Sequence, residues 1–258
     1  MSNFALALVV GLVAGLAEWD GFGFLHSQLS RPLMCGTLMG LVLGDIKTGM
    51  YVGASLQFVF LGSFGVGASL PPDATSGTCI ATALCIIAKL DPDVAVSLAI
   101  PVASFTLILQ MFIWTFNSTL MHAADRAAEV GDADRAGRWN LVGSFLFFVQ
   151  GFVPAFLAVQ FGAPYVASLV DIMPEWILGW LSLAGSMLPA VGFGMLFIMM
   201  NRPKLTPFFI IGIVLAASFG GTLISTGLIG LAAALLYVLT MDKFSSGERK
   251  TRRMADEG

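Results

Sequence analysis

The sequence predicts an all-α, polytopic membrane protein with broken and re-entrant helices, and three observations support this fold class. Hydrophobic residues make up 57% of the 258 residues and charged residues only 11%, whereas soluble domains average about 25% charged residues. Several apolar runs approach or exceed the roughly 18 to 20 residues that a helix needs to cross a bilayer, which argues against an outer-membrane barrel. Glycines, prolines and charged residues interrupt the first third of the chain, a pattern typical of broken helices around a polar cavity.

Charge and cysteine content exclude several other classes of protein. The net charge is −3 and the basic residues are scattered except near the C-terminus, so a nucleic-acid partner is not expected. The three cysteines, Cys35, Cys79 and Cys85, lie in apolar runs without metal-ligand spacing. They are interpreted as packed thiols, and the sequence predicts no metal site and no other cofactor.

The first third of the chain contains short apolar segments rather than simple spans. Residues 3–17 form a membrane segment, interpreted as retained rather than as a signal peptide because no Lys or Arg precedes it. A polar break is expected over residues 18–30. The apolar run 33–43 is too short to span alone, which favours a re-entrant or broken piece. A long run over residues 50–70 follows, and a short piece over residues 74–88 comes after Pro71 and Pro72.

The rest of the chain predicts longer spans. Residues 94–117 span with Pro101 inside, and a helical polar exit follows over residues 121–129. Residues 141–161 span with a kink at Pro154, and residues 176–200 cross back. Residues 205–240 suffice for two shorter segments that break near Gly220 and Gly221.

The expected organisation is one membrane-embedded domain over residues 1–240, with a polar broken-helix core over residues 31–89 and a tail over residues 241–258. Basic residues concentrate in the loop 121–140, in the turn 202–204 and in the tail, whereas the loop 162–175 is acidic. Because cytoplasmic loops are enriched in Lys and Arg, the first three are expected in the cytoplasm and the acidic loop outside. The C-terminus is therefore expected to be cytoplasmic.

A series of motifs in order along the chain carries a family resemblance. The chain resembles the IIC subunit of the mannose/fructose/sorbose family of bacterial phosphotransferase systems, and the resemblance covers nearly its whole length. The motifs that carry it are RPL at 31–33, GDIKTG at 44–49, GASLQ at 53–57, LG at 61–62, GASLPPDA at 67–74, HAADRAA at 122–128, NR at 201–202 and PFF at 207–209.

The resemblance implies a sugar permease subunit in the bacterial inner membrane. It implies a second membrane subunit, IID, in a trimer of IIC–IID heterodimers that moves sugar by an elevator mechanism. It also implies that a phosphorylated IIB or IIAB protein modifies the sugar in the cytoplasm, so that the chain itself is no enzyme.

Polar residues of the broken-helix core are the candidates for sugar contact: Gln57, Ser69, Pro72, Asp73 and Thr75. Buried amides and carboxylates suit hydroxyl recognition because an unpaired polar partner is costly in an apolar site. Gln57 stands alone in an apolar run, so it either contacts sugar or bonds one helix to another. Asp73 follows two prolines and is also expected to cap the next helix through backbone N–H groups near Thr75.

Four further residues are predicted to be structural or gating groups. Asp45 and Lys47 form a charged turn that shapes a hairpin. His122 and Asp125 lie three residues apart on one helix face at the cytoplasmic exit, where a structural or subunit-contact role is favoured over proton transfer.

The sugar itself stays open at this stage. Mannose-type members of the family carry Glu at the position of Gln57, and Asn and Ala at the positions of Gly65 and Pro71. An amide keeps one acceptor, adds donors and removes charge. An N-acetylgalactosamine-type amino sugar, sorbose and another hexose are therefore all candidates. Two rival functions are an ion-coupled secondary transporter, which would use the membrane carboxylates, and a non-transporting membrane scaffold.

Overall fold

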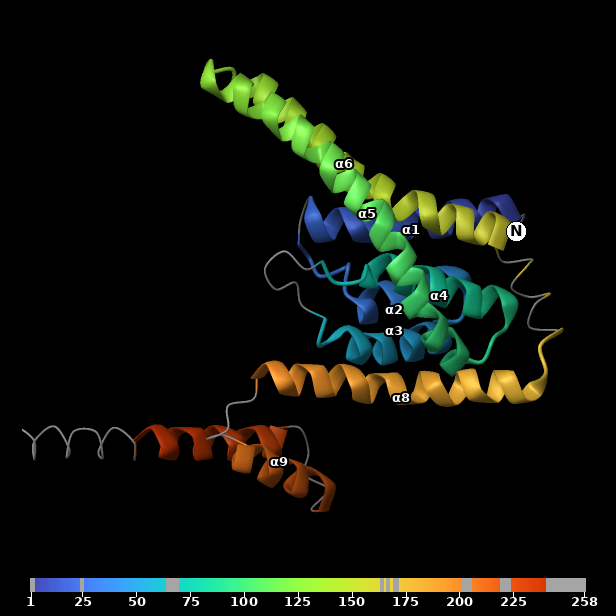
Figure 1. Ribbon diagram of the computed structural model, residues 1–258, viewed down its shortest axis with the longest axis vertical. Coiled ribbons are helices and arrows are strands. Elements are labelled where there is room, and N and C mark those ends of the chain that lie inside the picture. The colour runs from blue at the N-terminus through green and yellow to red at the C-terminus, as the bar shows by residue number, and fades with distance from the viewer. Residues whose placement is uncertain are drawn as a thin grey trace, which may run out of the picture. The chain divides into compact units, whose positions relative to one another are not determined.

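The computed structural model describes the chain as helices joined by turns, with no strand in the described residues (Figure 1). It describes residues 3–23, 26–63, 70–162, 165, 168, 172–200, 206–218 and 224–239. These residues belong to two compact units, Met1–Met199 and Met200–Gly258. The predicted all-α fold class is confirmed, while the single domain over residues 1–240 stays a prediction.

Four helices in the described residues are long and apolar enough to cross a membrane, as the hydropathy pattern predicted. α6 continues into one π-helical turn at Ala158–Gly162, which follows the internal Pro154. Pro101, by contrast, lies within a helix that stays continuous on both sides of it. The four helices are α1 (Asn3–Phe22), α5 (Pro92–Glu129), α6 (Ala133–Leu157) and α8 (Glu175–Met200).

Three short helices occupy the predicted broken-helix core: α2 (Pro32–Leu43), α3 (Ile46–Phe60) and α4 (Ala74–Ala88). The apolar run over residues 50–70 is not one continuous helix, because α3 ends at Phe60 and a turn follows at Leu61 and Gly62, while residues 64–69 lie outside the described residues. Glycine there lowers helix propensity in a segment that is otherwise apolar enough to continue.

The polar break expected over residues 18–30 begins too early. α1 continues through Glu18 and Asp20 to Phe22, and both carboxylates are buried. The helix tolerates them because other parts of the protein cover and bond them, which local hydropathy cannot indicate.

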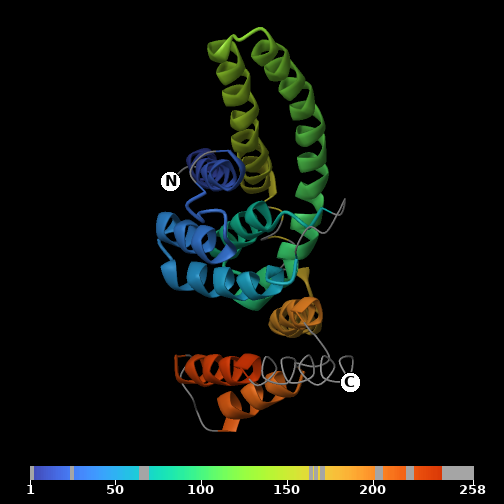
Figure 2. The same ribbon diagram turned by 90° about the vertical axis from the view of Figure 1, so that its left-hand side faces the viewer.

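α4 is the centre of the first unit. Every residue from 75 to 85 is buried, and α4 contacts α1, α2, α3, α5 and α6 (Figure 2). A helix that is buried all round needs small or apolar residues on every face. Threonines, cysteines and alanines meet that need here. Asp73 is the N-cap of this helix, so the position of α4 also fixes the position of Asp73.

α2 and α3 pack as a hairpin through glycines. A Cβ atom added at Gly36 would lie 2.7 Å from the Cα of Gly53, and one at Gly40 would lie 2.8 Å from the Cα of Gly49. Small residues at such positions let two helix backbones approach closely. Any side chain there would separate the helices.

α5 and α6 lie side by side as an antiparallel pair (Figures 1 and 2). Gly131, with φ +75°, makes the turn between them, and Asp132 caps α6 by accepting from the backbone N–H of Arg135 at 2.9 Å. The predicted loop over residues 121–140 is thus mostly helical, as the expected helical exit over residues 121–129 implied.

The second unit contains α9 (Thr206–Ser218) and a helix at Ile224–Leu239. The two shorter segments predicted for residues 205–240 are both present. The acidic residue Asp171, the turn 202–204 and the tail 241–258, which carry the topology prediction, lie outside the described residues.

Candidate functional site

A polar cavity of about 280 Å³ lies where the short helices meet α1 and α5. Its wall is formed by the C-terminal end of α1, the segment entering α2, the C-terminal end of α3, the turn before α4 and one residue of α5. Small-molecule sites are concave, with a few placed polar groups among apolar ones, and their volumes start near about 300 Å³. The cavity therefore suits a ligand of about one sugar ring.

Four of the five predicted substrate residues line this cavity: Gln57, Pro72, Asp73 and Thr75. The fifth, Ser69, lies outside the described residues. Gln57 and Asp73 come from different helices, so the fold brings together the amide and the carboxylate that the sequence singled out separately.

Gln57 is half-buried and fits both interpretations that the sequence left open. Its Oε1 accepts from the backbone N–H of Leu33 at 3.4 Å, one of the first-turn donors of α2 that has no partner inside that helix. The same side chain lines the cavity. Its amide therefore links α3 to the start of α2 and presents polar atoms at the cavity wall.

Asp73 caps α4 as predicted. Its Oδ1 accepts from the backbone N–H of Ser76 at 3.0 Å, and its own backbone N–H donates to the carbonyl oxygen of Ala103 at 3.2 Å. Thr75 adds a bond from its hydroxyl to the carbonyl oxygen of Ser30 at 3.0 Å. These bonds hold the Pro72–Asp73 turn against α5 and the segment that enters α2.

Replacing Asp73 should separate its capping role from its charge. Asp73→Ala should lower the stability of the protein by about 1 kcal/mol through loss of the cap, whereas Asp73→Asn should retain it, because Asn caps as well as Asp. Thermal unfolding of the purified membrane complex measures both variants. Equal destabilisation by the two substitutions would show that the cap is not what Asp73 contributes to stability.

The predicted structural or gating residues lie away from the cavity lining. Asp45 caps α3, accepting from the Thr48 hydroxyl at 2.7 Å and from its backbone N–H at 3.1 Å. These two bonds lower the pKa of Asp45, and the bond from the Thr48 hydroxyl has the larger effect. Lys47 is exposed, and so are His122 and Asp125 on α5. The Asp45 bonds lie in the turn between α2 and α3, and the structural or gating roles of all four residues stay predictions.

Sequence reasoning missed four polar residues of the cavity: Ser30, Arg31, Ser63 and Gln110. Gln110 of α5 is 6% exposed, and its Oε1 is buried without a hydrogen-bond partner. It stands alone in an apolar span, as Gln57 does, so the same rule would have identified it. Arg31 is exposed at the cavity wall, with its Nε donating to Gln28 Oε1 at 2.8 Å.

Two carboxylates of α1, Glu18 and Asp20, lie outside the cavity lining but near it in the chain, since Gly21 and Phe22 line the cavity. Asp20 accepts from Ser27 through its backbone N–H at 2.9 Å and its hydroxyl at 2.7 Å, and from the backbone N–H of Leu29 at 3.0 Å. These bonds shape the segment that leads to Arg31. Glu18 is fully buried, and Ser76 Oγ donates to its Oε1 at 3.4 Å.

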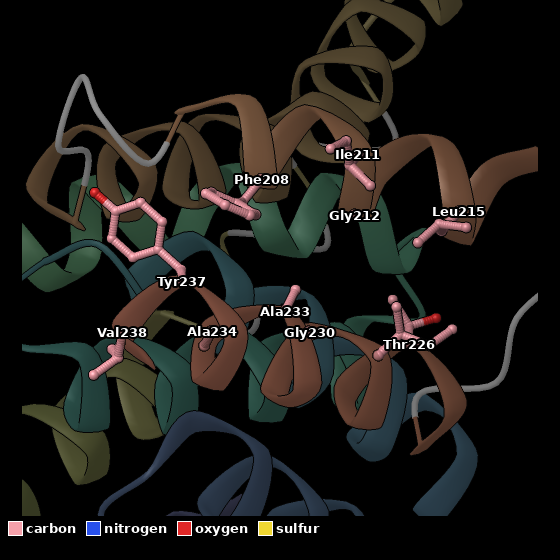
Figure 3. Close-up of a pocket in the computed structure, with 11 residues that line it drawn as sticks. Phe208, Ile211, Gly212, Leu215, Thr226, Gly230, Ala233, Ala234, Tyr237 and Val238 are labelled. Atoms are coloured by element: carbon pink, nitrogen blue, oxygen red, sulfur yellow. The ribbon is translucent and has the colours of Figure 1, made fainter. Parts of the chain in front are cut away.

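A larger cavity of about 410 Å³ lies within the second unit, between α9 and the helix Ile224–Leu239 (Figure 3). Phe208, Ile211 and Leu215 of α9 line one side of it, and Ala233 and Tyr237 of the other helix line the opposite side. Its lining contains no charged side chain and no amide. Because a sugar needs several hydrogen-bond partners, the polar cavity of the first unit is the better candidate.

Comparison with known proteins agrees with the family resemblance. The family described as "PTS system sorbose-specific iic component" matches residues 4–236. The mannose-specific EIIC component of Escherichia coli (strain K12) is 34% identical over 94% of this chain and 90% of its own length. The sorbose-specific EIIC component of Lacticaseibacillus casei is 32% identical, over 94% and 85%. N-acetylgalactosamine permease IIC component 1 of Escherichia coli (strain K12) is 30% identical, over 82% and 78%.

Two solved structures share the fold. One, a membrane protein, has a TM-score of 0.80 and 33% identity, covering 92% of this chain and 95% of the other. The cryo-EM structure of the mannose transporter ManYZ with microcin E492 contains a chain with a TM-score of 0.56 and 33% identity, covering 92% and 94%. The chain therefore belongs to the IIC components of the mannose/sorbose family of phosphotransferase systems, which are multi-pass membrane sugar permeases.

Proposed function

We propose that this chain, together with a IID subunit, imports a hexose or an amino sugar that a phosphorylated IIB protein modifies at the cytoplasmic face. The observation that carries the proposal is the polar cavity, which Gln57 and Asp73 both line within a permease fold. The chain supplies the path and the binding groups, and the phosphoryl transfer belongs to IIB.

The cavity chemistry suits a sugar ring. Amides at Gln57 and Gln110 and the guanidinium of Arg31 supply donors. Phe22 and Phe60 add aromatic surface to the same wall. A sugar presents hydroxyls at its rim and C–H groups on its faces, so a mixed lining of this kind matches both parts of its surface.

The uncharged amide at position 57 bears on the choice of sugar. An amide both donates and accepts, whereas a carboxylate only accepts. N-acetylgalactosamine, sorbose and other hexoses are the candidates that this difference leaves, and the first carries an acetamido group that pairs well with a side-chain amide.

Assembly and movement follow from family membership. We infer a trimer of IIC–IID heterodimers in the bacterial inner membrane, with the C-terminus in the cytoplasm and an elevator movement of the sugar site. The basic residues Arg252 and Arg253 near the C-terminus support the cytoplasmic location. The solved mannose transporter neighbour supports a multi-subunit assembly.

Uptake into vesicles tests the proposed function. Vesicles that contain the chain, IID and the phosphorylated IIB protein should accumulate phosphorylated sugar from a panel of labelled N-acetylgalactosamine, sorbose, fructose and mannose. Leaving out IID or IIB should abolish accumulation, and collapsing the proton and sodium gradients should not. Uptake by the chain alone that follows one of these gradients would instead indicate an ion-coupled carrier.

A further inference from the structure

Two carboxyl groups meet inside the protein behind the cavity. Glu18 of α1 is 0% exposed, and Asp73 at the start of α4 is 6% exposed. Both bond to Ser76: its hydroxyl donates to Glu18 Oε1 at 3.4 Å, and its backbone N–H donates to Asp73 Oδ1 at 3.0 Å. Ser76 is therefore a common hydrogen-bond partner that brings the two carboxyl groups close together.

The second oxygen of each carboxyl has no partner. Glu18 Oε2 and Asp73 Oδ2 are both buried without a hydrogen bond. An unpaired buried acceptor is costly, and two adjacent ionised carboxylates in a dry site also repel each other. One proton between these two oxygens would give both a partner and would remove one of the two charges. Carboxyl pairs that share a proton in this way occur in aspartic proteases.

Among the described residues, the groups that influence Glu18 supply no positive charge that would make the proton unnecessary. The groups that influence the charge state of Glu18, through their charge or through hydrogen bonds, are the Asp73 carboxyl, the Thr75 hydroxyl and the Cys35 thiol of α2. Glu18 and Asp73 in turn act on the Cys79 thiol of α4.

The other described neighbours of Glu18 also bring no positively charged side chain to it. α6 presents the backbone of Gly151 toward the Cγ of Glu18. Asp20, two residues further along α1, is occupied by its bonds to Ser27 and Leu29, and His26 acts on Asp20. None of these described groups carries a positive charge that would stabilise an ionised Glu18.

We propose that Glu18 is a neutral carboxylic acid that positions the sugar site by donating its O–H to Asp73. This inference rests on the proposed function, because it takes the cavity to be the sugar site. Glu18 is not part of the cavity lining, so it acts through Asp73 and the Pro72–Asp73 turn. The bond ties that turn to α1, in addition to the bonds that tie it to α5 and to the segment entering α2.

Loss of the proton should loosen the site. Two ionised carboxylates would repel, and the Pro72–Asp73 turn would move relative to α1. Sugar affinity should therefore fall as the pH rises, and this fall should depend on the residue at position 18. Glu18→Gln cannot lose a proton, but its amide N–H₂ still donates to Asp73. Glu18→Leu keeps the bulk and removes the bond.

Infrared spectroscopy of the complete IIC–IID complex tests the shared proton without any sugar. The C=O stretch of a neutral carboxylic acid should be present in the wild type, should disappear at high pH, and should be absent from Glu18→Gln. Asp20→Asn is the matched control, because it changes another α1 carboxylate that has its own donors, and it should leave this band unchanged. If the difference between the wild-type and Glu18→Gln spectra contains no such band, the proposal is overturned.

Sugar binding tests the positioning role, with labelled N-acetylgalactosamine, sorbose and mannose as probes. Glu18→Leu should weaken binding about tenfold at neutral pH, as expected for loss of a hydrogen bond to a charged group. Glu18→Gln should bind nearly as well as the wild type and should lose the pH dependence. Wild-type affinity in Glu18→Leu, or an unchanged pH profile in Glu18→Gln, would refute the role of Glu18.

The two experiments also separate this inference from the proposed function. If no probe binds to any variant while the infrared band behaves as expected, the shared proton stands and the assignment of the cavity to sugar fails. If a probe binds and is transported but the band does not depend on Glu18, the proposed function stands and the inference about Glu18 fails.

Discussion

Gln57→Ala should reduce sugar affinity by about 10- to 100-fold while leaving the membrane complex assembled. The side chain lines the polar cavity, and loss of a hydrogen bond in a desolvated site costs about 1 to 3 kcal/mol. The contact from Leu33 N–H to Gln57 Oε1 is long, at 3.4 Å, so its loss should cost the fold much less. Equilibrium binding of labelled N-acetylgalactosamine, sorbose and mannose to the purified complex measures the effect.

Two controls make the result specific. Thr115→Ala changes an exposed α5 hydroxyl that bonds only to the carbonyl oxygen of Met111, and it should leave binding unchanged. Copurification of IID should be equal for Gln57→Ala and the wild type. Unchanged sugar affinity in Gln57→Ala would place the sugar elsewhere, and loss of IID would assign Gln57 a structural role.

Gln57→Glu should change selectivity rather than remove binding. The carboxylate keeps an acceptor and loses the donor, and it is the residue expected from the family resemblance in mannose-type members. Affinity for mannose should therefore rise relative to N-acetylgalactosamine in the same binding assay. An unaltered ratio between the two sugars would show that position 57 does not choose the substrate.

Gly49→Ala should destabilise the protein by about 1 to 3 kcal/mol and disrupt the cavity as well. The added Cβ would lie 2.6 Å from both the carbonyl oxygen of Gly36 and the Cα of Gly40. Both are backbone atoms, so α2 and α3 must move apart, and overpacking of this kind costs about that much. Gln57 and Pro32 lie on these two helices at the cavity, so their separation should also weaken sugar binding.

Gly137→Ala is the matched control for this prediction. Gly137 is an exposed residue of α6 with nothing within 4 Å of an added Cβ. Alanine there should be neutral or stabilise by about 0.5 to 1 kcal/mol, because glycine is unfavourable in a helix. Thermal unfolding of the two variants in detergent compares them directly. Equal stability of Gly49→Ala and Gly137→Ala would contradict the close approach of α2 and α3.

The sequence by itself determined the fold class and predicted four of the residues that line the polar cavity. Hydropathy and length predicted the spans, because a helix that crosses a bilayer needs about 20 consecutive, mostly apolar residues. Isolated polar residues in apolar segments pointed to Gln57 and Asp73, because such groups are costly in a membrane without a role. The capping role of Asp73 could be predicted locally, since a cap bonds only to the next few residues.

Only the tertiary structure decided which of these groups meet. α3 stops at Phe60 although the apolar sequence continues, and α1 continues through the charged Glu18 and Asp20. Glu18 reaches Ser76 across 58 residues of sequence, and the cavity combines side chains from segments far apart in the chain. The local sequence determines whether a segment prefers lipid or water. Burial of a carboxylate, and the partner it finds there, depend instead on how separate helices pack against α4.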